Sequence, residues 1–315
     1  MTGRLTVIDC DPGTDDALAL WLALGSPELD VRLVTVAGGN VGLELTLANA
    51  RAVVGLAGLP VPVVGGADRP LLGRYVSETR VHAANGIGGI TLPEGPPAAP
   101  GVASDAIRDL LRRAGPGEAT LIGLGPATNL ALVFATEPAL ADRVREIILM
   151  TGAWGEGNIT PGAEFNAASD PEALAMLLAA GLPVSLVTLD LTAQAFVTPE
   201  RLAALRARGE GRCLGAACDI LAAVPTSRRF GFAGFPLHDP CAVALAVRPE
   251  LLAVREVAAR VECGEGPGRG RTHLDRWDRW DRWDRWGAPA NVRLAETLDA
   301  DGFFALLGER LAALP

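Results

Sequence analysis

The stretch Val7-Ile8-Asp9-Cys10-Asp11-Pro12-Gly13-Thr14-Asp15-Asp16 places four carboxylates within eight residues near the start of the chain. The apolar run at 5–8 predicts a buried strand, Pro12-Gly13 predicts a turn, and the apolar run at 17–24 predicts a helix. The carboxylates therefore gather at the carboxyl end of a strand and in the first turn of a helix. Open α/β sheets bind their ligands at this position.

These clustered like charges predict a divalent-metal site. Carboxylates repel one another unless a cation or protons neutralise them, and carboxylate oxygens are ligands that calcium prefers. The alternative is that Asp15 and Asp16 only cap the helix and favour its dipole. Capping accounts for one or two acids but not for four, so we favour the metal site.

Composition limits the class of protein. No apolar run in the 315 residues has the length of a membrane span, and the first four residues lead directly into the first strand. We therefore expect no signal peptide, no membrane partner and a soluble cytoplasmic protein. The net charge of −9 without a basic stripe argues against nucleic acid as a partner. Five cysteines without CxxC spacing fit a reducing compartment and neither a zinc site nor a disulfide framework.

The chain contains no lysine, and all 28 basic residues are arginine. This excludes Schiff-base chemistry, a phosphate-binding P-loop lysine and a lysine general base. A GC-rich genome explains the bias, but the chemical exclusion holds whatever its cause.

Apolar strand patterns alternate with helical patterns along most of the chain. The alternation predicts an α/β fold in which a mainly parallel, Rossmann-like open sheet is flanked by helices on both faces. A late β-like pair suggests a mixed sheet, and without a clear linker we expect one domain over residues 1–315. Strands are expected at 5–8, 31–37, 61–64, 119–123, 146–150, 184–188, 254–261 and 291–296, and helices at 17–24, 43–57, 103–114, 128–135, 171–180 and 302–314.

A tandem repeat of Asp-Arg-Trp occupies residues 275–286 and holds four of the six tryptophans. One interpretation is an aromatic binding box. We favour an expanded repeat inserted in a loop or hairpin, kept solvated by alternating acid and base, with tryptophans that cover a neighbouring surface or subunit.

The motifs of the chain resemble those of the nucleoside hydrolases, the calcium-dependent N-ribohydrolases, and they occur in the family's order. The opening segment is similar to the family's DxDPGxDD signature. The further matches are Gly38-Gly39-Asn40, His82 with the glycine-rich 85–89, Gly125-Pro126-Ala127-Thr128-Asn129-Leu130, Glu164-Phe165-Asn166 and His238-Asp239-Pro240.

The resemblance implies a calcium site. Its carboxylate ligands would be Asp11, Asp16 and Asp239, and its backbone ligand would be the carbonyl of Leu124, where family members often have threonine. A carbonyl ligand does not depend on its side chain. Asp9 is expected to support the turn or to orient the ligands.

The resemblance also implies hydrolysis of the N-glycosidic bond of ribonucleosides, with a calcium-bound water activated by Asp11. Cleavage through an oxocarbenium-like ribosyl cation needs a base, groups that hold the sugar hydroxyls and help for the leaving nucleobase. Asp15, Asn40, Glu164 and Asn166 are the expected ribose ligands. Taken alone, Asn40 would equally suit a turn residue after two glycines.

Two of the three histidines are candidates for the nucleobase side. His238 precedes the expected ligand Asp239, and in one branch of the family the matching histidine protonates the leaving base. His82 lies in a glycine-rich loop and either lines the nucleobase pocket or has a structural role. His273 receives no role.

Two loops, 65–100 and 225–237, are expected to form the mouth of the pocket. The second contains Arg228, Arg229, Phe230, Phe232 and Phe235, which suit a lid over a flat base. The alternative is an ordinary surface loop whose phenylalanines belong to the core.

The sequence thus predicts a hydrolase acting on N-glycosyl compounds, a ribosylpyrimidine or inosine–uridine nucleosidase of nucleoside salvage. By resemblance it would be a homodimer or homotetramer. A haloacid-dehalogenase-like phosphatase also carries DxD after its first strand, but it needs a lysine. A calcium-dependent nucleoside binder without turnover is the non-enzymatic alternative.

Overall fold

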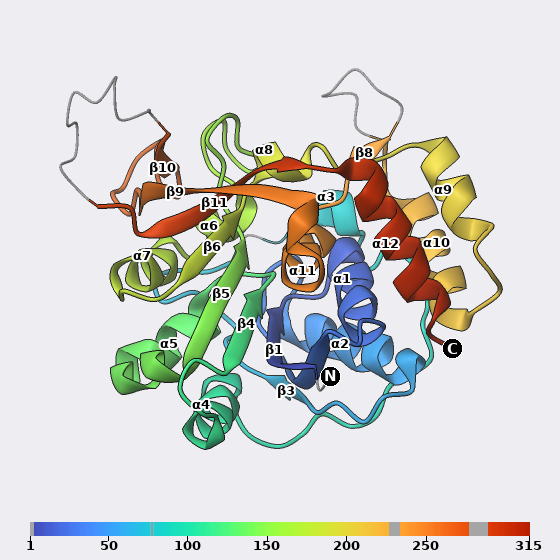
Figure 1. Cartoon of the computed structure of the whole chain (residues 1–315), viewed down its shortest axis with the longest axis horizontal. Helices are drawn as coiled ribbons and strands as arrows, with labels where there is room; N and C mark the ends of the chain where they lie inside the picture. The colour runs from blue at the N-terminus through green and yellow to red at the C-terminus, as the bar shows by residue number, and fades with distance from the viewer. Residues whose placement is uncertain (1–2, 76, 78, 227–233, 277–288) are drawn as a thin grey trace.

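The computed structural model describes residues 3–75, 77, 79–226, 234–276 and 289–315, and it is built around a nine-stranded sheet (Figure 1). The order of the strands is β10-β9-β11-β6-β5-β4-β1-β2-β3. The strands are β1 Arg4–Cys10, β2 Leu29–Val36, β3 Val63–Gly65, β4 Ala119–Gly123, β5 Val144–Met150, β6 Val184–Val187, β9 Leu252–Val261, β10 Thr272–Asp275 and β11 Val292–Leu298. A second sheet pairs β7 Phe196–Val197 with β8 Phe235–Pro236.

Helices cover both faces of the large sheet. One buried cluster joins α1, α2, α10, α11 and α12 to one face, and another joins α4, α5 and α7 to the other (Figure 1). The helices are α1 Thr14–Leu24, α2 Leu43–Ala57, α3 Thr79–His82, α4 Ala103–Arg113, α5 Thr128–Thr136, α6 Phe165–Ser169, α7 Pro171–Ala179, α8 Leu189–Thr192, α9 Pro199–Arg206, α10 Arg212–Ala223, α11 Asp239–Val247 and α12 Ala300–Ala312. Two short 3-10 helices are η1 Pro138–Arg143 and η2 Pro249–Leu251.

The strand order changes direction at β1. From β1 the chain adds β2 and β3 on one side, and β4, β5 and β6 on the other, all in parallel register. Loops that leave neighbouring strands in opposite directions open a crevice at the carboxyl ends of those strands. The first turn of the chain, Asp11 to Gly13, therefore lies at the switch point between β1 and β4.

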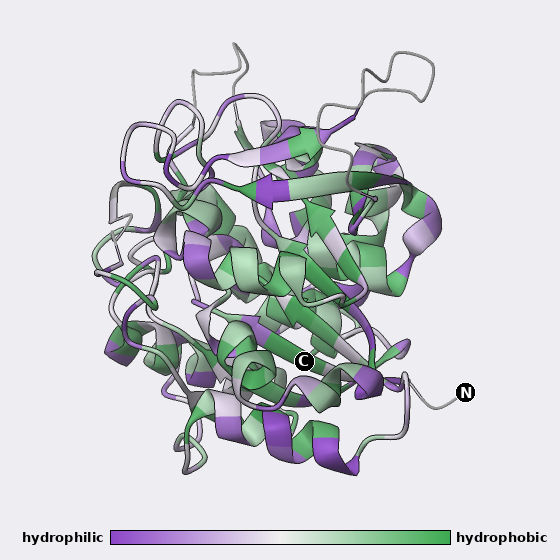
Figure 2. Ribbon diagram, turned by 90° about the vertical axis from the view of Figure 1, so that its left-hand side faces the viewer, coloured by the Kyte–Doolittle hydropathy of each residue, from purple (hydrophilic) through white to green (hydrophobic). Residues whose placement is uncertain are grey.

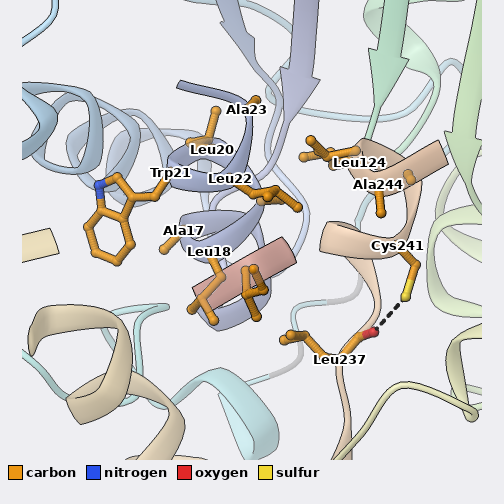
Figure 3. Close-up of a cluster of buried hydrophobic side chains, with 14 of the residues drawn as sticks. Ala17, Leu18, Leu20, Trp21, Leu22, Ala23, Leu124, Leu237, Cys241 and Ala244 are labelled. Atoms are coloured by element: carbon orange, nitrogen blue, oxygen red, sulfur yellow. Dashed lines mark hydrogen bonds between the residues drawn. The ribbon is translucent and has the colours of Figure 1, made fainter. Parts of the chain in front are cut away.

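Helix α1 is enclosed on most sides beside this crevice. All of its residues except Asp15 and Leu24 are buried, and it packs against α2, α10, α11 and α12. Figure 3 shows Leu124, Leu237, Cys241 and Ala244 on one side of α1 and its Trp21 on the opposite side. Its tryptophan, Trp21, is fully buried and donates its Nε1–H to the carbonyl of Val53 at 2.9 Å. This packing fixes the position of the acids in its first turn.

Helix α11 is buried along its whole length and lies against α1. It begins at Asp239, with Pro240 in the first turn, where a missing N–H costs nothing. Figure 2 shows the apolar colouring that runs through the sheet and the helices packed on it, with hydrophilic residues toward the outside. The acidic N-terminal ends of α1 and α11 thus lie together at the carboxyl ends of the central parallel strands.

The predicted α/β architecture is confirmed. The helix at 43–57 and the strand at 119–123 have the predicted bounds, and the late pair forms β9 and β11, which run antiparallel. Because β11 is parallel to β6, the sheet is mixed, as expected. Strand β10 and the small sheet of β7 and β8 were not predicted. Within the described residues, no helix combines the length and apolar character needed to span a bilayer.

Two predictions fall partly outside the described residues. The repeat at 275–286 is described only at Asp275 and Arg276, and the lid at 225–237 is described only at 225–226 and 234–237. Arg228, Arg229, Phe230 and Phe232 lie among the residues that are not described.

Candidate active site

A cavity of about 490 Å³ opens at the carboxyl ends of β1 and β4. Every site residue predicted from the sequence except Asp16 lines it, from the first strand to the start of α11. These residues are Asp11, Asp15, Asn40, His82, Leu124, Glu164, Asn166, His238 and Asp239. The structure therefore brings together motifs that are more than 200 residues apart in the chain.

Asp16 lies fully buried directly behind the cavity. Its Oδ1 accepts the N–H of Asp11 at 3.1 Å, and its Oδ2 accepts the N–H of Gly13 at 2.9 Å. The carboxylate therefore closes the turn between β1 and α1. Carboxylate oxygens of Asp15, Asp16 and Asp239 also lie within 4.8 Å of one another, a spacing that could hold a metal ion.

Asp11 is held between two glycines and an asparagine. A Cβ on Gly39 or on Gly125 would overlap its carboxylate oxygens, so only glycine allows this close approach. The N–H of Asn40 donates to Asp11 Oδ2 at 2.7 Å, and its Nδ2 donates to the Asp11 carbonyl at 3.1 Å. Asn40 thus shapes the turn and also lines the cavity, and its contact with a ribose stays a prediction.

The buried acids carry an excess of negative charge. Burial raises the pKa of Asp11 and of Asp239, and the charges of neighbouring acids raise both further. Burial also raises the pKa of Asp16, while the N–H of Gly13 lowers it. Bound protons or a bound cation would relieve this repulsion. Hard carboxylate oxygens fit a cation such as calcium, so the residues present match the group that the sequence implies.

Asp9, the fourth acid of the opening segment, does not line the cavity. Its Oδ1 accepts hydrogen bonds from Thr35 Oγ1 at 2.6 Å and from Asn129 Nδ2 at 2.9 Å. Burial raises the pKa of Asp9 to about 7, against the lowering effect of these two donors. Its contacts join β1, β2 and α5, which agrees with a supporting role.

Glu164 caps α6 and is held by four donors, although it faces the cavity. Burial raises its pKa, and the hydrogen bonds lower it. The donors are the N–H groups of Gly152, Asn166 and Ala167, at 2.8 to 2.9 Å, and the hydroxyl of Thr151 at 3.2 Å.

Asn166 links α6 to the ends of two strands. Its Nδ2 donates to the carbonyl of Leu124 at 2.6 Å and to that of Met150 at 2.9 Å. The amide is therefore fixed in orientation, directly beside the carbonyl that the sequence assigned to the metal.

His82 ends α3 and is buried against the first turn of α1. Its Nδ1 accepts the N–H of Thr14 at 3.1 Å and lies 3.0 Å from Thr14 Oγ1. Because a backbone N–H can only donate, Nδ1 carries no proton and the ring proton is on Nε2. His82 therefore supports α1 and also lines the cavity, and its contact with a nucleobase stays a prediction.

His238 is the N-cap of α11, and its ring contacts α8. Its Nδ1 lies 2.7 Å from Thr192 Oγ1, whose hydroxyl also lies 3.2 Å from the carbonyl of Leu189. Burial lowers the pKa of His238, and the charge of Asp15 raises it. Burial thus favours the neutral imidazole, and a proton that the ring does bind is given up more readily.

The cavity also has many apolar lining residues. Among the residues that the structure describes, no tryptophan lines it. Seven of its apolar lining residues come from α3, the end of α10 and the following residue pair, and the stretch from β8 to α11: Val81, Leu221, Val224, Pro225, Phe235, Pro236 and Leu237. The cavity thus combines polar groups that can bind sugar hydroxyls with apolar side chains that can contact a flat ring.

Residues 6–305 match the family model described as inosine-uridine preferring nucleoside hydrolase. The chain belongs to this family. The expected α/β fold and the expected activity class, a hydrolase acting on N-glycosyl compounds, are confirmed, and the haloacid-dehalogenase alternative is wrong.

Individual nucleoside hydrolases resemble the chain over nearly its whole length. The pyrimidine-specific ribonucleoside hydrolase RihA of Shewanella woodyi is 36% identical over 311 residues, covering 98% of both chains. A plant nucleoside hydrolase structure, PpNRh1, is 32% identical with a TM-score of 0.87, covering 98% of this chain and 99% of its own. A purine-preferring ribonucleoside hydrolase from Gardnerella vaginalis is 31% identical with a TM-score of 0.87, covering 98% of both chains.

The cavity of this nucleoside hydrolase also contains residues that sequence reasoning missed. Glu156 and Asn158 lie on the loop between β5 and α6, and Asp190 lies on α8. Polar residues in the glycine-rich stretch before Glu164 were a usable signal for the first two. Asp190 gave no signal, because the packing of α8 alone brings it to the cavity.

Proposed function

We propose that this nucleoside hydrolase is calcium-dependent, uses Asp11 as its general base and prefers pyrimidine nucleosides. The observation that carries the proposal is the meeting of four acids: Asp11, Asp15 and Asp239 line the cavity, and Asp16 is buried beside them. They lie where β1 ends and where two buried helices, α1 and α11, begin. Four acids in this position suit a cation and a sugar that becomes positively charged.

The proposed ligands of the cation are Asp11, Asp16, Asp239 and the carbonyl of Leu124. When bound, calcium would balance the acids and lower the pKa of a water in its coordination sphere. The raised pKa values of the three acids support this assignment, because each acid is destabilised as an anion by its burial and its neighbours.

Asp11 is the proposed base for the attacking water. Asn40 N–H and the two glycines hold its carboxylate in one orientation, so little reorganisation is needed before proton transfer. Asp15, Asn40, Glu164 and Asn166 are the proposed partners of the ribose hydroxyls. Buried acids beside the sugar would also stabilise the positive charge that develops as the glycosidic bond breaks.

His238 is the proposed acid for the leaving nucleobase. Replacing it by alanine should slow uridine and inosine by about 10²- to 10⁴-fold, the usual contribution of a general acid. The matched control is p-nitrophenyl riboside, whose phenolate leaves without a proton and should be hydrolysed at a nearly unchanged rate. Equal losses on both substrates would show that His238 positions the site and is not the acid. Calcium affinity should stay near normal, because Asp239 is intact.

The preference for pyrimidines rests on the apolar lining of the cavity. The described apolar lining of the cavity is aliphatic, prolyl and phenylalanyl, and it contains no tryptophan to stack on a large ring. RihA of Shewanella woodyi is named pyrimidine-specific, which agrees with the proposal. The Gardnerella vaginalis enzyme is named purine-preferring, so likeness alone does not decide the base.

Steady-state rates with uridine, cytidine, inosine and adenosine test the proposal. We expect kcat/KM for uridine and cytidine to exceed that for adenosine by at least about 10-fold, a typical gain from pocket fit. A preference for adenosine would contradict the proposed specificity. Binding without turnover of any of the four would instead indicate the non-catalytic binder. Assembly into homodimers or homotetramers and a cytoplasmic role in nucleoside salvage stay predictions.

A further inference from the structure

The loop from the end of β5 to α6 carries two residues of the cavity, Glu156 and Asn158, and both are exposed at its mouth. The hydrogen bonds within this loop are local: Gly157 N–H donates to the Pro161 carbonyl at 3.0 Å, and Asn158 N–H donates to the Ala163 carbonyl at 3.1 Å. An exposed loop with local bonds needs outside contacts to hold its side chains in one place.

One outside contact comes from α8. The carboxylate of Asp190 accepts the N–H of Trp154 at 2.8 Å and the N–H of Gly155 at 3.0 Å. A Cβ on Gly155 would lie 2.6 Å from Asp190 Oδ1, so glycine permits this approach. Asp190 therefore holds the start of the loop through two backbone hydrogen bonds.

A second contact comes from β10, the edge strand that precedes the tandem repeat. The hydroxyl of Thr272 donates to the Ala153 carbonyl at 2.7 Å and accepts the N–H of Ala153 at 2.9 Å. Arg271 and Ala163 form an antiparallel bridge at the other end of the loop. Both ends of the loop thus contact the segment that leads into the repeat.

The third contact is made by Arg276, the first arginine of the repeat. Its guanidinium carbon lies 4.1 Å from the centre of the Trp154 ring, within the range of a cation–π interaction. Its Nε lies 2.9 Å from Glu296 Oε1 on β11, which orients the guanidinium. Arg276 therefore contacts the side chain of Trp154, and Asp190 accepts a hydrogen bond from the backbone N–H of the same residue.

We propose that Arg276 is a positioning residue for nucleoside binding: through Trp154 it fixes the loop that presents Glu156 and Asn158 to the cavity. The inference rests on the proposed function of the cavity, since it concerns the substrate that the cavity binds. It gives the first Asp-Arg-Trp unit a role beyond a solvated insertion.

The test compares Arg276→Gln with Arg255→Gln. Arg255 pairs with the same carboxylate, Nη2 to Glu296 Oε1 at 2.8 Å, so its replacement removes an ion pair while the Arg276–Trp154 contact stays. Arg276→Gln should raise KM for uridine by about 3- to 10-fold, the range of a partly exposed cation–π contact, with kcat changed much less. Arg255→Gln should leave KM near the wild-type value, and Arg276→Lys should restore part of the loss.

Amide hydrogen exchange gives a readout that does not depend on turnover. In Arg276→Gln the amides of residues 154–158 should exchange faster than in the wild type, and in Arg255→Gln they should not. In a double-mutant cycle, Trp154→Leu combined with Arg276→Gln should raise KM no more than either change alone.

Unchanged KM and unchanged exchange in Arg276→Gln would overturn the inference, as would equal effects in Arg255→Gln. Failure of the wild type to hydrolyse any nucleoside would overturn the proposed function instead, and the exchange measurement would still decide the role of Arg276.

Discussion

Replacing Asp11 by asparagine should lower kcat for uridine by at least about 10³-fold, which exceeds the usual loss of one hydrogen bond and falls within that of a general base. Asparagine has nearly the same shape and can still accept the N–H of Asn40, so the fold should be kept. The variant loses the negative charge that takes up the proton and binds the cation. Stopped assays with excess enzyme would measure the residual rate.

A second pair of variants separates the charge of Asp11 from its position. Gly39→Ala places a methyl group against the Asp11 carboxylate without altering any charge, and it should also lower kcat strongly. Gly42→Ala, three residues further on, meets open space and should leave kcat nearly unchanged. Near wild-type turnover in both Asp11→Asn and Gly39→Ala would mean that the base lies elsewhere.

Much of the fold was predictable because long elements carry a strong hydrophobic period. The helix α4 buries Ala103, Ile107, Leu110 and Leu111 on one face, and β4 and the second half of β5, 147–150, are buried throughout, as in a sheet covered on both faces. The strands β7 and β8 have two residues each and are too short to show a hydrophobic period. Strand β10 pairs with β9, but we predicted no hairpin from the segment that joins them.

The residues of the candidate site that belong to local sequence motifs could be predicted. Asp11, Asn40 and Asp239 each follow a strand or open a helix, so their meeting at one sheet edge follows from the topology. The double use of Asp16, which closes the turn of Asp11 and Gly13 and also faces Asp239, was not visible from spacing. Asp190 reaches the cavity only through tertiary packing, which no local pattern encodes.

We propose above that the acids near the N-terminal ends of α1 and α11 bind calcium, and that hydrolysis depends on this calcium. Removing the metal leaves Asp11, Asp16 and Asp239 as buried, mutually repelling anions, whose pKa values burial has already raised. They should then bind protons instead, and the cavity should lose its capacity to activate a water. The loss should be reversible, because the helices that carry the acids are held by apolar packing (Figure 3).

The most direct measurement is the rate of uridine hydrolysis by protein stripped with a chelator, before and during titration with calcium. The account predicts that activity falls to background in the stripped protein and returns as calcium is added, with one ion bound per chain by calorimetry. Full activity in protein shown to be free of metal would contradict the account.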